Sequence, residues 1–155
     1  MFVSKEITAA LPNIHLLGML VMTYTLVFRV KALAAIYLYV FLNGLYSGFA
    51  SWWVPYLYVW TVLWGITMLL PKKMPKWLAT IVYPVVCSLH GFAFGLLYAP
   101  AQALMYDLNL QEMLFWIAEG IPFDVIHGIS NFFVGMLIFP FSELLKMLMR
   151  KGLRH

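Results

Sequence analysis

Charged residues and cysteine are scarce in this sequence. Only 10% of its 155 residues are charged, whereas a typical soluble domain has about a quarter. The single cysteine, Cys87, cannot form an internal disulfide, and its apolar neighbours indicate a small core residue. The low charge argues against an ordinary soluble domain, and the lone cysteine argues against a disulfide-stabilised one.

Common catalytic motifs are also missing. The sequence contains no HExxH, CxxC or GxSxG, and no glycine-rich loop that could hold a phosphate. We therefore expect no enzyme activity, no cofactor and no metal site. Energy for any active transport would have to come from another subunit or from an ion gradient. The net charge of +4 does not indicate a nucleic-acid partner, because the basic residues cluster at segment ends.

Apolar residues, by contrast, make up 64% of the chain and recur in long stretches between proline, glycine and charged residues. This pattern predicts an all-α polytopic membrane protein, with residues 1–155 forming a single integral membrane domain. The expected segments are 1–11, 13–28, 32–50, 56–70, 77–98 and 122–148. Because a spanning helix needs about 20 residues, we predict a compact bundle of about six transmembrane helices with a short or truncated first helix. We expect no cleavable signal peptide.

Basic residues predict the orientation of this bundle. They stand at alternate ends of successive segments, so that all of the following fall on one side of the membrane: Arg29, Lys31, Lys72, Lys73, Lys76, Lys146, Arg150, Lys151 and Arg154. The positive-inside rule makes that side cytoplasmic. We therefore expect a multi-pass protein of the cytoplasmic membrane with a cytoplasmic C-terminus. The opposite side holds residues 12–15, 51–56 and 98–122, and the last of these has acidic residues but no basic one.

The last segment contains polar residues within "EGIPFDVIHGISNFFVG". Asp124, His127 and Asn131 are spaced i, i+3, i+7, which places them on one face of a helix. In one interpretation Pro122 starts the helix, Asp124 occupies its first turn, and the polar residues bond neighbouring helices. In the other they face a ligand cavity open to the outside, because ionisable groups within a membrane are costly. Glu119 precedes this stripe and is expected at its rim.

Aromatic and polar residues also mark the outer ends of earlier segments. Trp52, Trp53 and Tyr56 lie in "ASWWVPYLYVW" and could form either a membrane-interface belt or a stacking lid over a flat ligand. In "LPNIH", Asn13 is suited to capping the helix that follows, whereas His15 fits a structural role or a ligand contact equally well.

His90 lies near the middle of the fifth segment. We expect it to bond a neighbouring helix, although it could reach the floor of a cavity. It precedes Gly91 and Gly95, whose spacing is typical of close helix packing, as is that of Gly44 and Gly48.

Six short segments and the sequence "WIAEGIPFDVIHGISNFF" resemble the S components of energy-coupling factor (ECF) transporters. The stretches "LPNIHLLGMLVMTYTLVFRVKAL" and "GFASWWVPYLYVW" are similar to parts of the same family, so the resemblance runs from Leu11 onward. It implies a high-affinity substrate-binding subunit for a vitamin or similar micronutrient captured from outside. Its partners would be a transmembrane coupling subunit and two ATPase subunits. Here the adjacent Ala9 and Ala10 replace the Ala-xxx-Ala surface by which the family's first helix meets the coupling subunit.

The resemblance also implies a substrate site in the outer half, where the polar and aromatic residues lie. The expected substrate-binding residues are Asp124, His127, Asn131, Trp52, Trp53 and Tyr56, followed by Asn13, His15, Gln102 and Glu119. An acid-bearing, aromatic-lined pocket favours a flat ligand that is neutral or cationic. With no arginine or lysine on the outer side, a dicarboxylate such as folate is disfavoured.

Two other classes of protein remain open. A small membrane scaffold of the bacterial shape-determining type would share the helical bundle and bind protein partners in place of a solute. A membrane enzyme or haem protein is disfavoured by the missing motifs, although His15 and His127 lie at similar depth and could in principle ligate haem.

Overall fold

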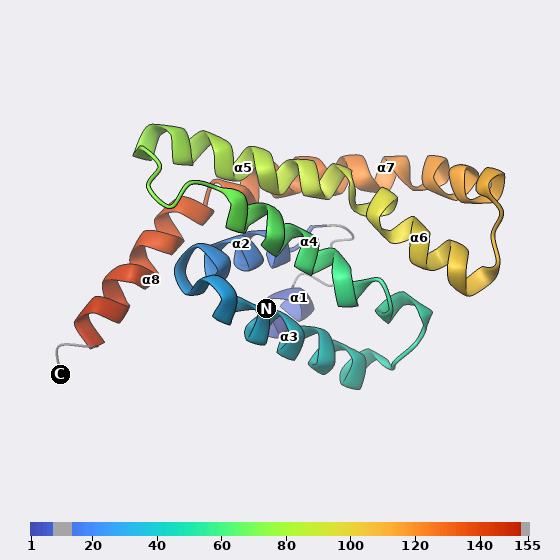
Figure 1. Ribbon diagram of the computed structural model, residues 1–155, viewed down its shortest axis with the longest axis horizontal. Coiled ribbons are helices and arrows are strands. Elements are labelled where there is room, and N and C mark those ends of the chain that lie inside the picture. The colour runs from blue at the N-terminus through green and yellow to red at the C-terminus, as the bar shows by residue number, and fades with distance from the viewer. Residues whose placement is uncertain (8–13, 153–155) are drawn as a thin grey trace.

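The structure, a computed structural model, describes residues 1–7 and 14–152, and these form helices with no strand among them (Figure 1). The all-α prediction is thereby confirmed for this part of the chain. The helices are α1 (Phe2–Ile7), α2 (Leu17–Phe28), η1 (Arg29–Lys31), α3 (Ala32–Ser47), η2 (Ser51–Trp53), α4 (Tyr56–Leu69), α5 (Lys76–Phe92), α6 (Phe94–Tyr106), α7 (Leu110–Gly135) and α8 (Ile138–Gly152).

Two helical stretches, Leu17–Ser47 and Lys76–Tyr106, are long and apolar enough to cross a membrane. A third is added if α7 and α8, which are bent by 45° at their junction, form one span. These stretches are consistent with a membrane protein. Since α2 has 12 residues and α4 has 14, fewer than the 20 or so of an upright span, a bundle of six complete spans stays a prediction.

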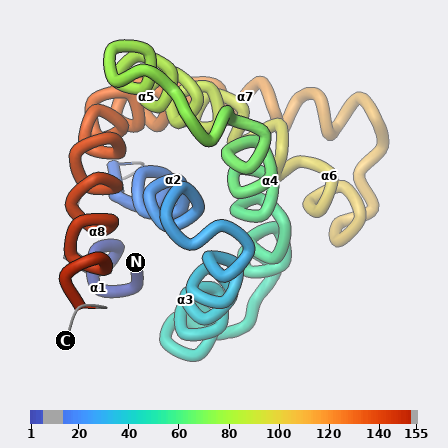
Figure 2. Tube along the Cα trace, turned by 60° about the vertical axis from the view of Figure 1, so that its left-hand side comes forward, coloured from blue at the N-terminus to red at the C-terminus, as the bar shows by residue number. Residues whose placement is uncertain are grey.

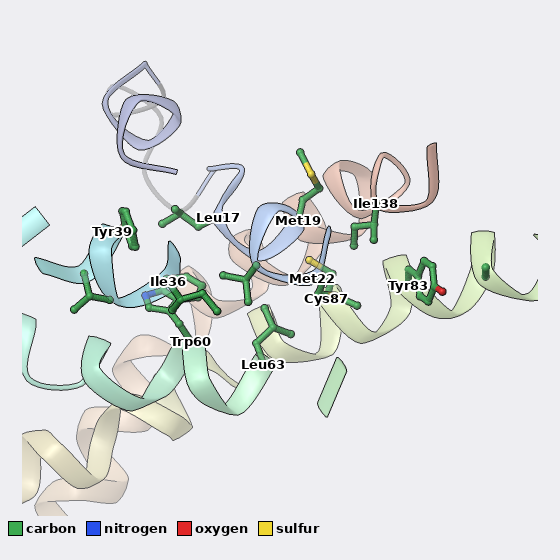
Figure 3. Close-up of a cluster of buried hydrophobic side chains, with 13 residues drawn as sticks. Leu17, Met19, Met22, Ile36, Tyr39, Trp60, Leu63, Tyr83, Cys87 and Ile138 are labelled. Atoms are coloured by element: carbon green, nitrogen blue, oxygen red, sulfur yellow. The ribbon is translucent and has the colours of Figure 1, made fainter. Parts of the chain in front are cut away.

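Helix α2 lies at the centre of the bundle. Figure 2 shows it surrounded by α3, α4, α5, α7 and α8, and it contacts each of them. Apart from Thr23, Tyr24 and Thr25 its residues are apolar, as is typical of a helix buried among others. The close-up in Figure 3 shows Met22 of α2 among Trp60 and Leu63 of α4 and Cys87 of α5, all of which are fully buried.

The turn from α2 to α3 is tied to the end of α4. Arg29 ends α2 with a positive φ of 55°. Its guanidinium donates a hydrogen bond to the carbonyl of Met68 at 3.0 Å, and its own carbonyl accepts one from the indole of Trp64 at 3.2 Å. These bonds hold the α2–α3 turn beside the end of α4, where the α4–α5 connection begins.

The basic segments gather at one end of the long axis. In Figure 1 the α2–α3 turn, the α4–α5 connection and α8 lie toward the left, whereas the α3–α4 and α6–α7 connections lie at the right. This arrangement agrees with the charge pattern of the sequence for the residues that the structure describes. Which end faces the cytoplasm stays a prediction from the positive-inside rule.

Three boundaries differ from the sequence-based expectation. Pro122 does not start a helix, because α7 begins at Leu110 and Pro122 lies within it. The start is set by a capping box, in which Asn109 accepts from the Glu112 N–H at 3.0 Å and the Glu112 carboxylate accepts from the Asn109 N–H at 2.8 Å. The fifth segment breaks at Ala93, and α6 continues through the region expected to be a connection. The sixth segment is divided between α7 and α8.

Helices α5 and α7 approach each other very closely through glycine. A Cβ added at Gly91 would lie 2.9 Å from the Cα of Gly128, and one at Gly135 would lie 2.8 Å from the Cα of Pro84. Real Cβ atoms do not approach so near, so only glycine allows the two backbones to meet here. The packing role predicted for Gly91 is confirmed. Gly48 differs, since nothing lies within 4 Å of its added Cβ and its φ is +86° at the end of α3.

We expect Gly91→Ala to lower the free energy of unfolding by about 1–3 kcal/mol, because the methyl group forces α5 and α7 apart. The matched control is Gly120→Ala, where an added Cβ meets nothing within 4 Å. It should be neutral or raise the free energy by up to about 1 kcal/mol through helix propensity. Thermal unfolding of both variants in one detergent measures the difference, and equal shifts of the melting temperature would contradict this packing.

Candidate functional site

The polar stripe of α7 faces inward at two of its three positions. His127 and Asn131 are buried and lie one helical turn apart. Asn131 donates from its side-chain nitrogen to the carbonyl of Cys87 on α5 at 3.3 Å. That side chain also lies beside Gly18 of α2 and Gly91 of α5. The stripe therefore points into the junction of α2, α5 and α7.

Asp124 has a partner within the protein. Both of its carboxylate oxygens accept from the N–H of Gly95, each at 3.0 Å. Gly95 is the second residue of α6, so the carboxylate satisfies a free N–H in the first turn and faces the positive end of the helix dipole. A Cβ at Gly95 would lie 3.2 Å from the carboxyl carbon. Asp124 thus bonds a neighbouring helix, and its predicted contact with substrate stays a prediction.

We expect Asp124→Asn to lower the free energy of unfolding by about 1 kcal/mol, because a neutral oxygen caps the start of α6 less well than a carboxylate. Glu119→Gln, an exposed change of the same kind on the same helix, should stay within about 0.5 kcal/mol of the original protein. Thermal unfolding again measures both. The capping role would be wrong if Asp124→Asn melted like Glu119→Gln.

Five side chains, among them His127 from the middle of this stripe, form a closed ring of contacts, and we refer to them as the histidine–aromatic cluster. The members are His15, His127, Phe94, His90 and Trp60, in the order in which they touch. Successive ring centroids are 4.8, 4.9, 6.2, 5.8 and, closing the ring, 6.1 Å apart. Trp60 and Phe94 also meet across the cluster at 5.8 Å.

Each member of the cluster comes from a different part of the fold. His15 lies two residues before the start of α2, and the others belong to α4, α5, α6 and α7. Trp60, His90 and His127 are 0, 3 and 2% exposed. The cluster is therefore the point at which most of the bundle converges.

Several polar atoms of this region are buried without a hydrogen-bond partner. They are Nδ1 of His15, Nε1 of Trp60, Nδ1 of His90, Nε2 of His127 and Oδ1 of Asn131. Leaving one such atom unpaired costs about 1–3 kcal/mol. A core that served only packing would carry apolar side chains here. The arrangement is suited to a polar ligand that pairs these atoms, with aromatic rings against its faces.

The predicted aromatic residues take different positions. The ring of Tyr56 contacts Trp60 at 5.8 Å and Phe94 at 6.4 Å, so it adjoins the cluster. Trp52 meets Tyr56 at 5.6 Å and extends the aromatic surface toward the α3–α4 turn. The indole of Trp53 donates to the carbonyl of Val40 at 2.8 Å, which anchors η2 to α3. Tyr56 and Trp52 are thus joined to the cluster, and Trp53 holds the turn beside it.

The remaining predicted residues lie farther out or outside the described residues. Gln102 is half-buried on α6, about two turns beyond Phe94. Glu119 is exposed on α7 and lines a shallow depression of about 660 Å³ together with Trp116. Asn13 falls outside the residues that the structure describes. Neither Gln102 nor Glu119 is a member of the histidine–aromatic cluster.

Sequence reasoning assigned no site role to Trp60 or Phe94, and it expected His90 to bond a neighbouring helix or to reach the floor of a cavity. A usable signal was present, because Tyr56 and Trp60 are four residues apart, as are His90 and Phe94. Residues with this spacing share a helix face. His90 does bond a neighbouring helix as predicted, with Nε2 lying 3.1 Å from the carbonyl of Val59 on α4.

The geometry does not suit metal or haem. Within residues 1–7 and 14–152, no group of three or more histidine, cysteine, aspartate or glutamate side chains is arranged to hold a metal ion. His15 and His127 are in edge contact at 4.8 Å and 71°, which leaves no space for a porphyrin between them.

Comparisons of the chain with family models, with curated proteins and with solved structures find no match.

Proposed function

We propose that this protein is the substrate-binding subunit of an ECF-type importer and captures a vitamin or related micronutrient from outside the cell. One observation carries the proposal, namely the buried polar atoms without partners in and beside the histidine–aromatic cluster. Their combined cost is several kcal/mol. A bound small molecule that pairs them would convert this cost into affinity and specificity for that molecule.

The surroundings of the cluster support a binding role. Trp52, Tyr56 and Tyr98 continue the aromatic surface, with Tyr98 meeting Tyr56 at 6.4 Å. They lead toward the α3–α4 turn, which lies at the end of the molecule opposite the basic segments (Figure 1). If the basic end is cytoplasmic, a solute would approach the cluster from outside. This is the direction that an uptake subunit needs.

The proposed partners are a transmembrane coupling subunit and two ATPase subunits. The chain has no phosphate-binding loop of its own, so the energy for import would come from these partners. The surface of α3, α5 and α7 that faces away from the core carries many exposed apolar side chains. Such a surface is suited to lipid and to helices of a membrane partner.

The test is to isolate the tagged protein from its native membranes in mild detergent. We expect it to retain a small molecule in near-stoichiometric amount and to co-isolate a membrane coupling subunit with two ATPase chains. His127→Phe should lose the small molecule, because it removes a buried polar atom from the cluster. The control Phe115→Leu changes an exposed ring on the same helix and should keep it.

Native mass spectrometry of the complex and mass spectrometry of the extracted small molecules provide the measurements. A protein that carries no enriched small molecule and isolates only with cell-shape proteins would contradict the proposal. That result would favour the membrane scaffold instead.

A further inference from the structure

We infer that the substrate is a neutral, planar nitrogen heterocycle that donates at least two hydrogen bonds, one to His90 and one to Asn131. This inference rests on the proposed function, since it names the chemical class of molecule that the same site would take. It follows from the direction of two hydrogen bonds within the protein.

The Val59 carbonyl determines which nitrogen of His90 carries the proton. Nε2 of His90 lies 3.1 Å from that carbonyl oxygen, which can only accept. Nε2 is therefore the donor. In a neutral imidazole the other nitrogen, Nδ1, is then an acceptor, and it is buried without a partner. The ligand must bring an N–H or O–H to this atom.

The Cys87 carbonyl determines the orientation of the Asn131 amide in the same way. The side-chain nitrogen of Asn131 donates to that carbonyl at 3.3 Å. The side-chain oxygen is left as an acceptor, fully buried and without a partner. His90 and Asn131 therefore present two acceptors, and neither can turn its donor toward the ligand without losing a bond to the backbone.

The other unpaired atoms define the rest of the ligand. The Trp60 indole N–H can only donate. A ligand that pairs it must therefore carry an acceptor, such as a ring nitrogen or a carbonyl oxygen. His15 and His127 contact each other, and each imidazole can donate or accept according to its tautomer. The rings of Phe94 and Tyr56, which meet edge to face at 6.4 Å, make the surroundings of these atoms aromatic. A planar heterocycle with both N–H donors and ring acceptors matches this set.

The absence of a free counter-charge in the cluster favours a neutral ligand. The five members are imidazoles and neutral aromatic rings, and the charged groups beside them are bonded within the protein, Asp124 to the Gly95 N–H and Lys5 to the side-chain oxygen of Asn43. A charge buried without a partner is far more costly than a buried dipole. The ligand is therefore expected to carry no net charge at neutral pH.

The experiment uses the small molecule released from the purified protein as its own probe. Its mass is measured in ordinary and in heavy water, because each N–H or O–H gains one deuterium, and its electrophoretic mobility at neutral pH reports its charge. We expect two or more exchangeable hydrogens and no net charge. A released molecule that is charged, or that has fewer exchangeable hydrogens, would overturn this inference and leave the proposed function standing.

Variants of His90 test the acceptor directly. In His90→Gln the amide nitrogen can still donate to the Val59 carbonyl, but the acceptor at Nδ1 is gone. We expect the occupancy of the small molecule to fall about tenfold with little change in the melting temperature of the ligand-free protein. His90→Phe removes the bond to the Val59 carbonyl as well as the acceptor for the ligand. It should lower both the occupancy and the melting temperature. Unchanged occupancy in His90→Gln would overturn the acceptor role, whereas loss of every ligand from the unmodified protein would overturn the proposed function as well.

A second inference comes from α8, where three kinds of residue occupy three faces. Ile138 and Ser142 are buried against the bundle. Phe141, Leu144 and Leu148 are exposed apolar residues with spacing i, i+3, i+7. A third row follows the same spacing and is charged, with Glu143, Lys146 and Arg150.

We propose that α8 lies along the membrane surface and that its basic residues Lys146, Arg150 and Lys151 bind the headgroup of an anionic phospholipid. The exposed apolar row would enter the acyl region, and the 45° bend from α7 turns the helix away from the direction of the preceding span. Lys146, Arg150 and Lys151 line one small hollow of about 270 Å³, in which Glu143 binds Lys146 at 2.8 Å. Positive charge beside an apolar row is complementary to an anionic lipid rather than to a zwitterionic one.

The test reconstitutes the protein in nanodiscs with an equal mixture of phosphatidylcholine and phosphatidylglycerol, and native mass spectrometry then counts the retained lipids. We expect retention of phosphatidylglycerol over phosphatidylcholine, and a fall in that preference of about tenfold in Lys146→Gln/Arg150→Gln. The control Lys72→Gln/Lys73→Gln removes the same charge from another basic segment and should keep the preference. Equal lipid retention in both double variants would overturn the proposal and favour an acidic protein partner for this row.

Discussion

The close contact of α5 with α7 is the constraint on which the rest of the structure depends. Gly91 and Gly128 allow the two backbones to meet, and Gly135 does the same beside Pro84. At this separation His90 and His127 project into one region, and Asn131 reaches the carbonyl of Cys87. A larger residue at Gly91 would separate the helices and disperse the polar groups. Glycine at this position thus sets the distance between the polar side chains of the two helices.

The polar residues of α7 show two ways of compensating polarity in an apolar protein. Asp124 is paired within the fold, since its carboxylate caps the N-terminus of α6. His127 and Asn131 each retain a buried side-chain atom without a hydrogen-bond partner. The first arrangement stabilises the break between α5 and α6. The second leaves an unfavourable free energy uncompensated within the fold, and the proposed binding role rests on it.

Helical periodicity accounted for part of the candidate site. It placed His127 and Asn131 on one face of α7, and both are buried there. It could not distinguish Asp124 from them, because the partner of Asp124 exists only where α5 ends at Ala93 and α6 begins. Trp53 was likewise grouped with Tyr56 by sequence proximity. In the tertiary structure, the indole of Trp53 donates a hydrogen bond to the carbonyl of Val40.

The sequence by itself determined that the chain is helical and apolar, that its basic residues gather at segment ends, and that glycine sets close packing at Gly91. These properties follow from composition and local spacing. Only the tertiary structure decided which rings meet, because His15, Trp60, His90, Phe94 and His127 lie on five separate segments. Local spacing tells which face of a helix a residue occupies, but not which neighbour that face will meet. The neighbours depend on crossing and breaks between helices, and these arise from packing of the whole bundle.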